Sequence, residues 1–210
     1  MTDTPQPPEL GFVHRFEPAT RPGLPPLLLL HGTGGDENDL VPLGARIAPG
    51  AALLSPRGKV RENGMPRFFR RLAEGVFDLD DLKARAHELG EFVERARTTY
   101  GLDKPIAAGF SNGANIASAV MLLRPEILAG AILMRGTVPF VPGEMPDLAG
   151  IPVLILAGSA DPMVSPDGRA ALADLLKKAG AAVTAVEIEA GHGLTMQDIA
   201  LASRWLAERS

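Results

Sequence analysis

Short apolar runs alternate along the chain with longer stretches of helical periodicity, and this alternation restricts the possible folds more than any other feature. The run "PPLLLLHG" at 25–32 is continuously apolar and stopped by glycine, as is typical of a strand buried on both faces. Later runs of the same kind are "AALLSP", "PIAAGF", "GAILMRG", "IPVLILAG" and "AAVTAVEIE". Earlier, "GFVHRFE" alternates in hydrophobicity and predicts an edge strand.

Helical patterns separate these runs. The clearest cover 78–100, 165–179 and 194–209, and a helix of small residues follows "PIAAGF". Strands that alternate with helices predict an α/β fold, a three-layer sandwich in which helices cover both faces of a mostly parallel sheet.

Composition narrows the class of protein. The 210 residues predict a single domain over 1–210, with a loose Pro-rich tail at 1–9. A net charge of −4 gives no sign of nucleic-acid binding, and the absence of cysteine excludes disulfides. The N-terminus lacks the pattern of a signal peptide, and aliphatic stretches such as the four leucines at 27–30 are far too short to span a membrane. We therefore expect a soluble cytoplasmic protein without integral membrane association, either a monomer or a homodimer.

Polar residues that suit catalysis follow four of the predicted strands. In a parallel sheet, binding groups gather at the carboxyl ends of the strands. A glycine-rich turn, "HGTGGD", follows the leucine run, Ser111 follows "PIAAGF", Asp161 follows "IPVLILAG", and His192 follows "AAVTAVEIE". Serine, aspartate and histidine in this chain order predict the catalytic triad of an α/β-hydrolase.

Each member of this set has a chemical reason to be there. A serine hydroxyl becomes a nucleophile when a base removes its proton, and His192 titrates near neutral pH. Asp161, bound to the other ring nitrogen, would fix the tautomer of the imidazole. Gly109 and Gly113 flank Ser111 and would let the chain turn back sharply enough to expose the hydroxyl.

The reaction also requires donors for a developing oxyanion. The backbone N–H groups of Asn112 and Thr33 are the candidates, because one follows the nucleophile and the other lies in the glycine-rich turn. We expect His31, in the same turn, to make local hydrogen bonds in a structural role.

Other interpretations of these motifs stay open. Gly-x-Ser-x-Gly can be a structural turn, Asp161-Pro162 can be a turn as well, and His192 can simply precede a helix. The glycine-rich turn lacks the Gly-Lys-Ser/Thr ending of a P-loop. The chain has no His-x-x-x-His pair and no carboxylate cluster at ligand spacing, so we expect neither metal nor cofactor.

The segment 56–71, "PRGKVRENGMPRFFRR", is basic and follows a predicted strand. One interpretation places Phe68 and Phe69 as walls of the substrate pocket, with an arginine such as Arg57 meeting a substrate carboxylate. The alternative is structural, with the arginines paired to the acidic stretch "EGVFDLDDL" just downstream.

The motifs "LLLLHGTGGDENDL", "GFSNGANIA", "GSADPMVS" and "GHGLT" together resemble the phospholipase/carboxylesterase family of small α/β-hydrolases, which includes acyl-protein thioesterases. The resemblance extends over about 25–205, and the "SPRG…RFFRR" segment is most similar to the bacterial carboxylesterase branch. One departure is Asn112, since the family often has glutamine after the nucleophile.

This resemblance implies an α/β-hydrolase fold without a large lid. It implies Ser111 as nucleophile, Asp161 as acid and His192 as base, with Thr33 and Asn112 forming the oxyanion hole. The expected activity is hydrolysis of small-molecule carboxylic esters of short to medium acyl chains through an acyl-enzyme. Acyl-protein thioesterase or lysophospholipase activity is the first alternative, and a non-catalytic ligand-binding relative is the second.

Overall fold

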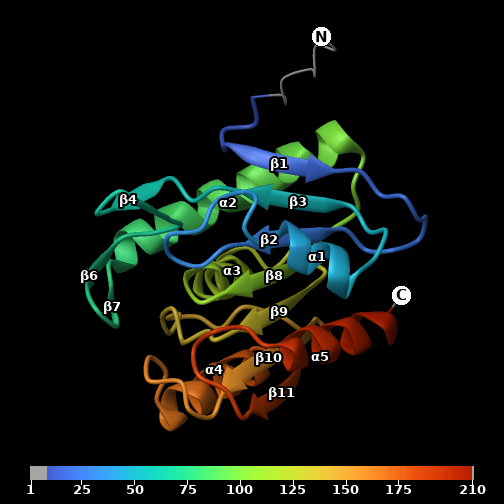
Figure 1. Ribbon diagram of the computed structural model, residues 1–210. Coiled ribbons are helices and arrows are strands. Elements are labelled where there is room, and N and C mark those ends of the chain that lie inside the picture. Colours follow the sequence, from blue (N-terminus) through green and yellow to red (C-terminus); the bar gives the residue numbers. More distant parts are fainter. Residues whose placement is uncertain (1–8, 210) are drawn as a thin grey trace.

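The computed structural model describes residues 9–209, and within them a central sheet has strands in the order β1-β3-β2-β8-β9-β10-β11 (Figure 1). Strand β1 pairs antiparallel with β3, and every other neighbouring pair in this sheet is parallel. The strands are β1 (His14–Glu17), β2 (Leu27–Leu30), β3 (Leu53–Pro56), β8 (Ile106–Phe110), β9 (Gly130–Met134), β10 (Pro152–Gly158) and β11 (Ala182–Ile188).

Helices cover both faces of the sheet. They are α1 (Val41–Ile47), α2 (Leu79–Tyr100), α3 (Asn112–Leu123), α4 (Pro166–Lys178) and α5 (Met196–Ala207). Buried side chains of α2, α3 and α4 form one core with the sheet, and those of α1 and α5 form a second core on the opposite face. Figure 1 shows this three-layer arrangement, with the sheet strands stacked between the helices.

The leucine run of β2 shows why the central strands are continuously apolar. Leu28 and Leu30 belong to the core under α2, α3 and α4, whereas Leu27 and Leu29 belong to the core under α1 and α5. All four side chains are fully buried. A strand between two helical layers has no polar face, so it cannot show the alternation of an exposed sheet.

Most of the expected elements are confirmed. Each of the six apolar runs forms a strand of the sheet, and the alternating segment "GFVHRFE" contains β1, which lies at its edge. Helix α2 begins after Asp78, whose side chain accepts a hydrogen bond from the Asp81 N–H, and ends at Gly101 with φ +66°. The tail predicted at 1–9 lies, apart from the exposed Glu9, outside the described residues.

Helix α1 and two small hairpins between β3 and α2 were not predicted from the sequence. The hairpins are β4 (Val60–Glu62) with β5 (Met65–Arg67), and β6 (Arg71–Ala73) with β7 (Val76–Phe77). The first turns at Asn63 and Gly64, both with positive φ. Asn-Gly is the strongest short-range hairpin signal, so this element was readable from the sequence.

Across residues 9–209, no helix combines the length and apolar character that crossing a membrane requires.

Candidate active site

Ser111 stands in the turn that joins β8 to α3, in a backbone conformation that few non-glycine residues adopt. Its φ is +52° and its ψ is −112°, and it is the residue directly before the first helical residue, Asn112. The Ser111 N–H donates to the Met134 carbonyl on neighbouring β9, at 2.9 Å. Such backbone strain costs about 1–3 kcal/mol and is found most often at functional sites, so the conformation of Ser111 indicates a functional position.

The glycines on either side of Ser111 are required by close backbone contacts. A Cβ on Gly113 would lie 1.9 Å from the Leu30 carbonyl oxygen, and a Cβ on Gly109 would lie 2.5 Å from the Gly113 carbonyl oxygen. No side chain fits at either distance. The two glycines therefore let the first turn of α3 pack directly against β2 and β8, which is the tight strand-turn-helix geometry expected from the sequence.

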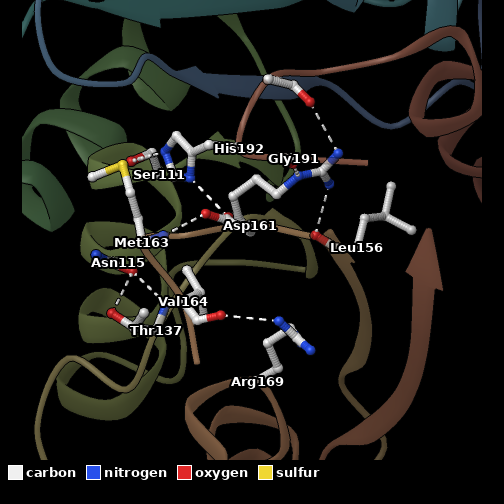
Figure 2. A network of polar contacts seen from close by, with 12 residues as sticks. Ser111, Asn115, Thr137, Leu156, Asp161, Met163, Val164, Arg169, Gly191 and His192 are labelled. Carbon is white, nitrogen blue, oxygen red and sulfur yellow. Dashed lines mark hydrogen bonds and ion pairs between the residues drawn. The ribbon is translucent and has the colours of Figure 1, made fainter. Parts of the chain in front are cut away.

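His192 lies between Ser111 and Asp161, as Figure 2 shows. The distance from His192 Nε2 to Ser111 Oγ is 3.0 Å, and that from His192 Nδ1 to Asp161 Oδ2 is 2.8 Å. Asp161 is buried, and its other oxygen accepts a hydrogen bond from the Met163 N–H at 2.8 Å. Residues from the turns after β8, β10 and β11 thus form one hydrogen-bonded chain, although 81 residues separate the serine from the histidine.

A cavity of about 370 Å³ opens beside the hydrogen-bonded residues Ser111, His192 and Asp161. It is lined by Ser111, His192, Thr33 and Asn112, among others. Within the described part of the chain, no backbone acceptor is found for the N–H of Thr33 or of Asn112. Helix N-termini and glycine-rich turns leave such donors free for an anion. Both groups expected to form an oxyanion hole therefore lie at the cavity that contains the serine.

His31 holds the glycine-rich turn in place. Its Nδ1 lies 2.7 Å from the Gly32 carbonyl oxygen, and its Nε2 accepts a hydrogen bond from the Gly58 N–H at 3.0 Å. Because Nε2 accepts, Nδ1 must carry the proton, so the ring is neutral. Burial lowers the pKa of His31. The local hydrogen bonding expected for this residue is confirmed.

The side chain of Asn112 binds the basic segment 56–71. Its Oδ1 accepts a hydrogen bond from the Phe68 N–H at 2.8 Å, and its buried Nδ2 has no hydrogen-bond partner within residues 9–209. The asparagine after Ser111 therefore ties the segment 56–71 to the start of α3.

The expectation that Phe68 and Phe69 wall the pocket is wrong. Phe68 is 2% exposed and packs its ring against His31, with 4.6 Å between the ring centroids, and Phe69 is fully buried against Phe77. Neither residue lines the cavity. The hairpins fold so that both rings turn inward to the core, which shields far more apolar surface from water than a position at the cavity mouth would.

Arg57 does not line the cavity either, because its guanidinium pairs with Glu37. The Arg57 Nη2–Glu37 Oε1 distance is 2.6 Å, and this hydrogen bond lowers the pKa of Glu37. Glu37 lies upstream in the turn after β2, not in the acidic stretch downstream. The structural interpretation, in which arginines of this segment pair with the acidic stretch just downstream, is correct for Arg70. Arg70 pairs with Asp78 at 2.7 Å.

The second hairpin supplies the cavity wall instead. Arg71, Glu74, Gly75 and Phe77 line it from one side, and Pro162, Met163 and Val164 line it from the loop after Asp161. Arg67 lines the cavity too and shares the carboxylate of Glu62 with Arg71, which lowers the pKa of Glu62. These cavity-lining residues were not predicted from the sequence, because the face of the hairpin on which each side chain lies depends on how the hairpin strands pair.

Among residues 9–209, no group of three or more histidines and carboxylates is placed to hold a metal ion.

The parallel sheet, the strained serine after β8, and the aspartate and histidine after later strands define the class of α/β-hydrolases. The crystallised Bacillus cereus carboxylesterase has a TM-score of 0.93 and 43% identity, over 96% of each chain. A carboxylesterase from Mesorhizobium loti has a TM-score of 0.91 and 37% identity, over 97% of this chain and 98% of the other.

The putative hydrolase MhqD of Bacillus subtilis is 45% identical over 197 residues, which are 93% of this chain and 98% of that protein. No family model matches the chain. The chain belongs to the phospholipase/carboxylesterase family of small α/β-hydrolases, whose members include esterases.

Proposed function

We propose that this protein is a serine hydrolase that cleaves carboxylic esters of short to medium acyl chains. One observation carries the proposal, namely the hydrogen-bonded chain from Ser111 Oγ through the His192 ring to Asp161, at 3.0 and 2.8 Å. The kinship with carboxylesterases at 37–43% identity supports the ester as the substrate class.

The proposed reaction has two halves. In the first, His192 Nε2 takes the hydroxyl proton as Ser111 Oγ attacks the ester carbonyl carbon, and the Thr33 and Asn112 N–H groups donate to the resulting oxyanion. The imidazolium then gives its proton to the departing alcohol, leaving an acyl-Ser111 ester. In the second half, His192 takes a proton from water, the hydroxide attacks the acyl carbon, and the acid leaves as Ser111 regains its proton.

The size of the cavity supports the chain-length preference. At about 370 Å³, its volume lies near the lower end of the usual range for ligand pockets, and much of it is bordered by charged and polar groups. The ring of Phe77 is the largest apolar group on the hairpin side. An acyl chain of about two to six carbons would then bind best, since each further buried methylene contributes about 0.8 kcal/mol only if it finds apolar surroundings.

The test is covalent labelling with a fluorophosphonate probe together with the Ser111→Ala variant. The wild type should bind one probe per chain, and Ser111→Ala should bind none and lose at least about 10⁴-fold in kcat while its circular dichroism is unchanged. Activity above about 1% of wild type in purified Ser111→Ala would contradict the assignment of the nucleophile.

A thioesterase or lysophospholipase acting on long acyl chains is a second candidate. The hairpin that lines the cavity also carries the exposed apolar side chains of Leu72 and Val76, which a long chain could contact. The two candidates differ in kcat/KM for p-nitrophenyl esters from acetate to palmitate, kept below micelle-forming concentrations. An optimum at short chains supports the ester hydrolase, and a steady rise to palmitate supports the second candidate.

A further inference from the structure

Arg135 is a buried arginine in a strained backbone conformation, beside the candidate active site. It is 2% exposed and its φ is +56°. It directly follows Met134, whose carbonyl accepts the hydrogen bond from the Ser111 N–H. Its own N–H donates to the Leu156 carbonyl on β10 at 2.9 Å. A left-handed arginine at this position persists only because its surroundings hold it there.

The guanidinium of Arg135 forms a paired ionic contact with Asp198. The Nη1–Oδ1 distance is 2.7 Å and the Nη2–Oδ2 distance is 2.9 Å, and both side chains are completely buried. Asp198 also accepts hydrogen bonds from the N–H and hydroxyl of Thr195, which precedes the first helical residue of α5. The pair therefore connects the end of β9 to the start of α5.

The remaining donors of Arg135 reach the backbone on both sides of His192. Nε donates to the Gly191 carbonyl at 3.0 Å, and Nη2 donates to the Gly193 carbonyl at 3.1 Å. Nη1 also donates to the Leu156 carbonyl at 3.1 Å.

We infer that Arg135 is a positioning residue for His192, an inference that rests on the proposed function. One rigid guanidinium fixes the residues before and after His192 and is itself fixed by Asp198. The His192 ring is therefore held with Nε2 toward Ser111 and Nδ1 toward Asp161. Because Arg135 also follows the residue that anchors the Ser111 N–H, the same segment sets the distance between nucleophile and base.

Only arginine suits this role. Its planar fork offers five donors in fixed directions, which match a carboxylate and several carbonyls at once, whereas lysine offers a single flexible ammonium. A displacement of about 1 Å in a catalytic group can cost on the order of 10²-fold in rate. We therefore expect Arg135→Lys to lower kcat by about 10²-fold, with KM close to that of the wild type.

The experiment compares Arg135→Lys and Asp198→Asn with the wild type and with Leu89→Ala. Leu89 is a buried core residue of α2 outside the site, so its truncation lowers the melting temperature without touching the loop around His192. Circular dichroism confirms that each variant is folded at the assay temperature. Both site variants should lose kcat, and Leu89→Ala should keep the wild-type kcat.

The downfield proton resonance of the His192 Nδ1–H gives a second measurement that does not depend on turnover. It should weaken or disappear in folded Arg135→Lys and Asp198→Asn and persist in Leu89→Ala. The inference is overturned if either folded site variant keeps both the wild-type kcat and this resonance, or if Leu89→Ala loses kcat to the same extent. A wild type that fluorophosphonate does not label would instead refute the proposed function, and the resonance would still test the positioning.

Discussion

At the scale of single residues, the proposed chemistry depends on which nitrogen of His192 carries the proton. Asp161 accepts from Nδ1, which leaves Nε2 free to take the proton of Ser111. In Asp161→Asn, an amide N–H₂ group can face Nδ1 and favour the wrong tautomer. We expect kcat to fall by about 10⁴-fold with the fold unchanged, as measured by steady-state ester hydrolysis and circular dichroism.

Asp167 provides the matched control for this substitution, because it lies in the first turn of α4, beyond the same loop. Asp167→Asn should retain nearly full activity. The opposite result, with an active Asp161→Asn and an inactive Asp167→Asn, would show that Asp161 is not the acid of the triad.

His31 should make the stability of the protein depend on pH. Burial lowers its pKa, so the folded state favours the neutral ring that accepts from the Gly58 N–H. The stability from this ring is complete above its unfolded pKa of about 6.5 and is lost as pH falls toward the folded pKa, because the unfolded chain then binds more protons.

Urea unfolding of the wild type and of His31→Gln between pH 5 and pH 8 measures this effect. The free energy of unfolding of the wild type should decrease below about pH 6.5, and that of His31→Gln should change less over the same range. At pH 8 the variant should be less stable by about 1–3 kcal/mol, since it leaves buried backbone groups with poorer partners. Equal pH slopes in the two proteins would assign the dependence to another group.

At the scale of elements, the hairpin of β6 and β7 determines the shape of the cavity. Phe77 lines the cavity from this hairpin, with its ring packed edge-on against buried Phe69. Phe77→Ala should enlarge the acyl site and move the optimum in kcat/KM for p-nitrophenyl esters toward longer chains.

Phe69→Ala is the control within the same hairpin region. It should reduce the free energy of unfolding by about 3–5 kcal/mol through a core cavity and leave the chain-length optimum in place. If Phe77→Ala leaves the optimum unchanged, the acyl chain occupies the other side of the cavity, near Met163.

The elements differ in how far the sequence could predict them. The runs that became β2, β8, β9 and β10 were readable because strands buried on both faces leave an uninterrupted apolar signal. The strands β4 to β7 are two or three residues long, too short for any periodicity. Without the register of these hairpins, the sequence "PRFFRR" does not show that Phe68 and Phe69 turn inward. Nor does the segment 56–71 show that Arg71, and not Arg57, borders the cavity.

At the scale of the whole molecule, the positions of Ser111, Asp161 and His192 followed from one topological rule, that parallel strands end at a common edge. The rule needs only the order of strands and the polar residue after each. The rule gives no information on Arg135, because an arginine that follows a predicted strand is as compatible with an exposed position as with a buried ion pair to Asp198. Its role appears only when β9 and α5 are placed in space.

The distance along the chain between the parts of the site has a consequence for refolding. Ser111 and His192 are 81 residues apart, and the parallel pairing of β8, β9, β10 and β11 must be complete before they meet. Non-local pairing of this kind is slow, and no local segment can form early with a working site. The single tryptophan, Trp205, is buried in α5, so its fluorescence reports the docking of the last helix.

After dilution from denaturant, recovery of esterase activity should therefore follow the same rate constant as the change in Trp205 fluorescence, whereas the total far-ultraviolet circular dichroism can recover in part earlier. Activity that returns before the fluorescence change would show a site that forms without α5. In that case the protein acquires its activity only when α5 docks, and we expect partly folded forms to have no esterase activity.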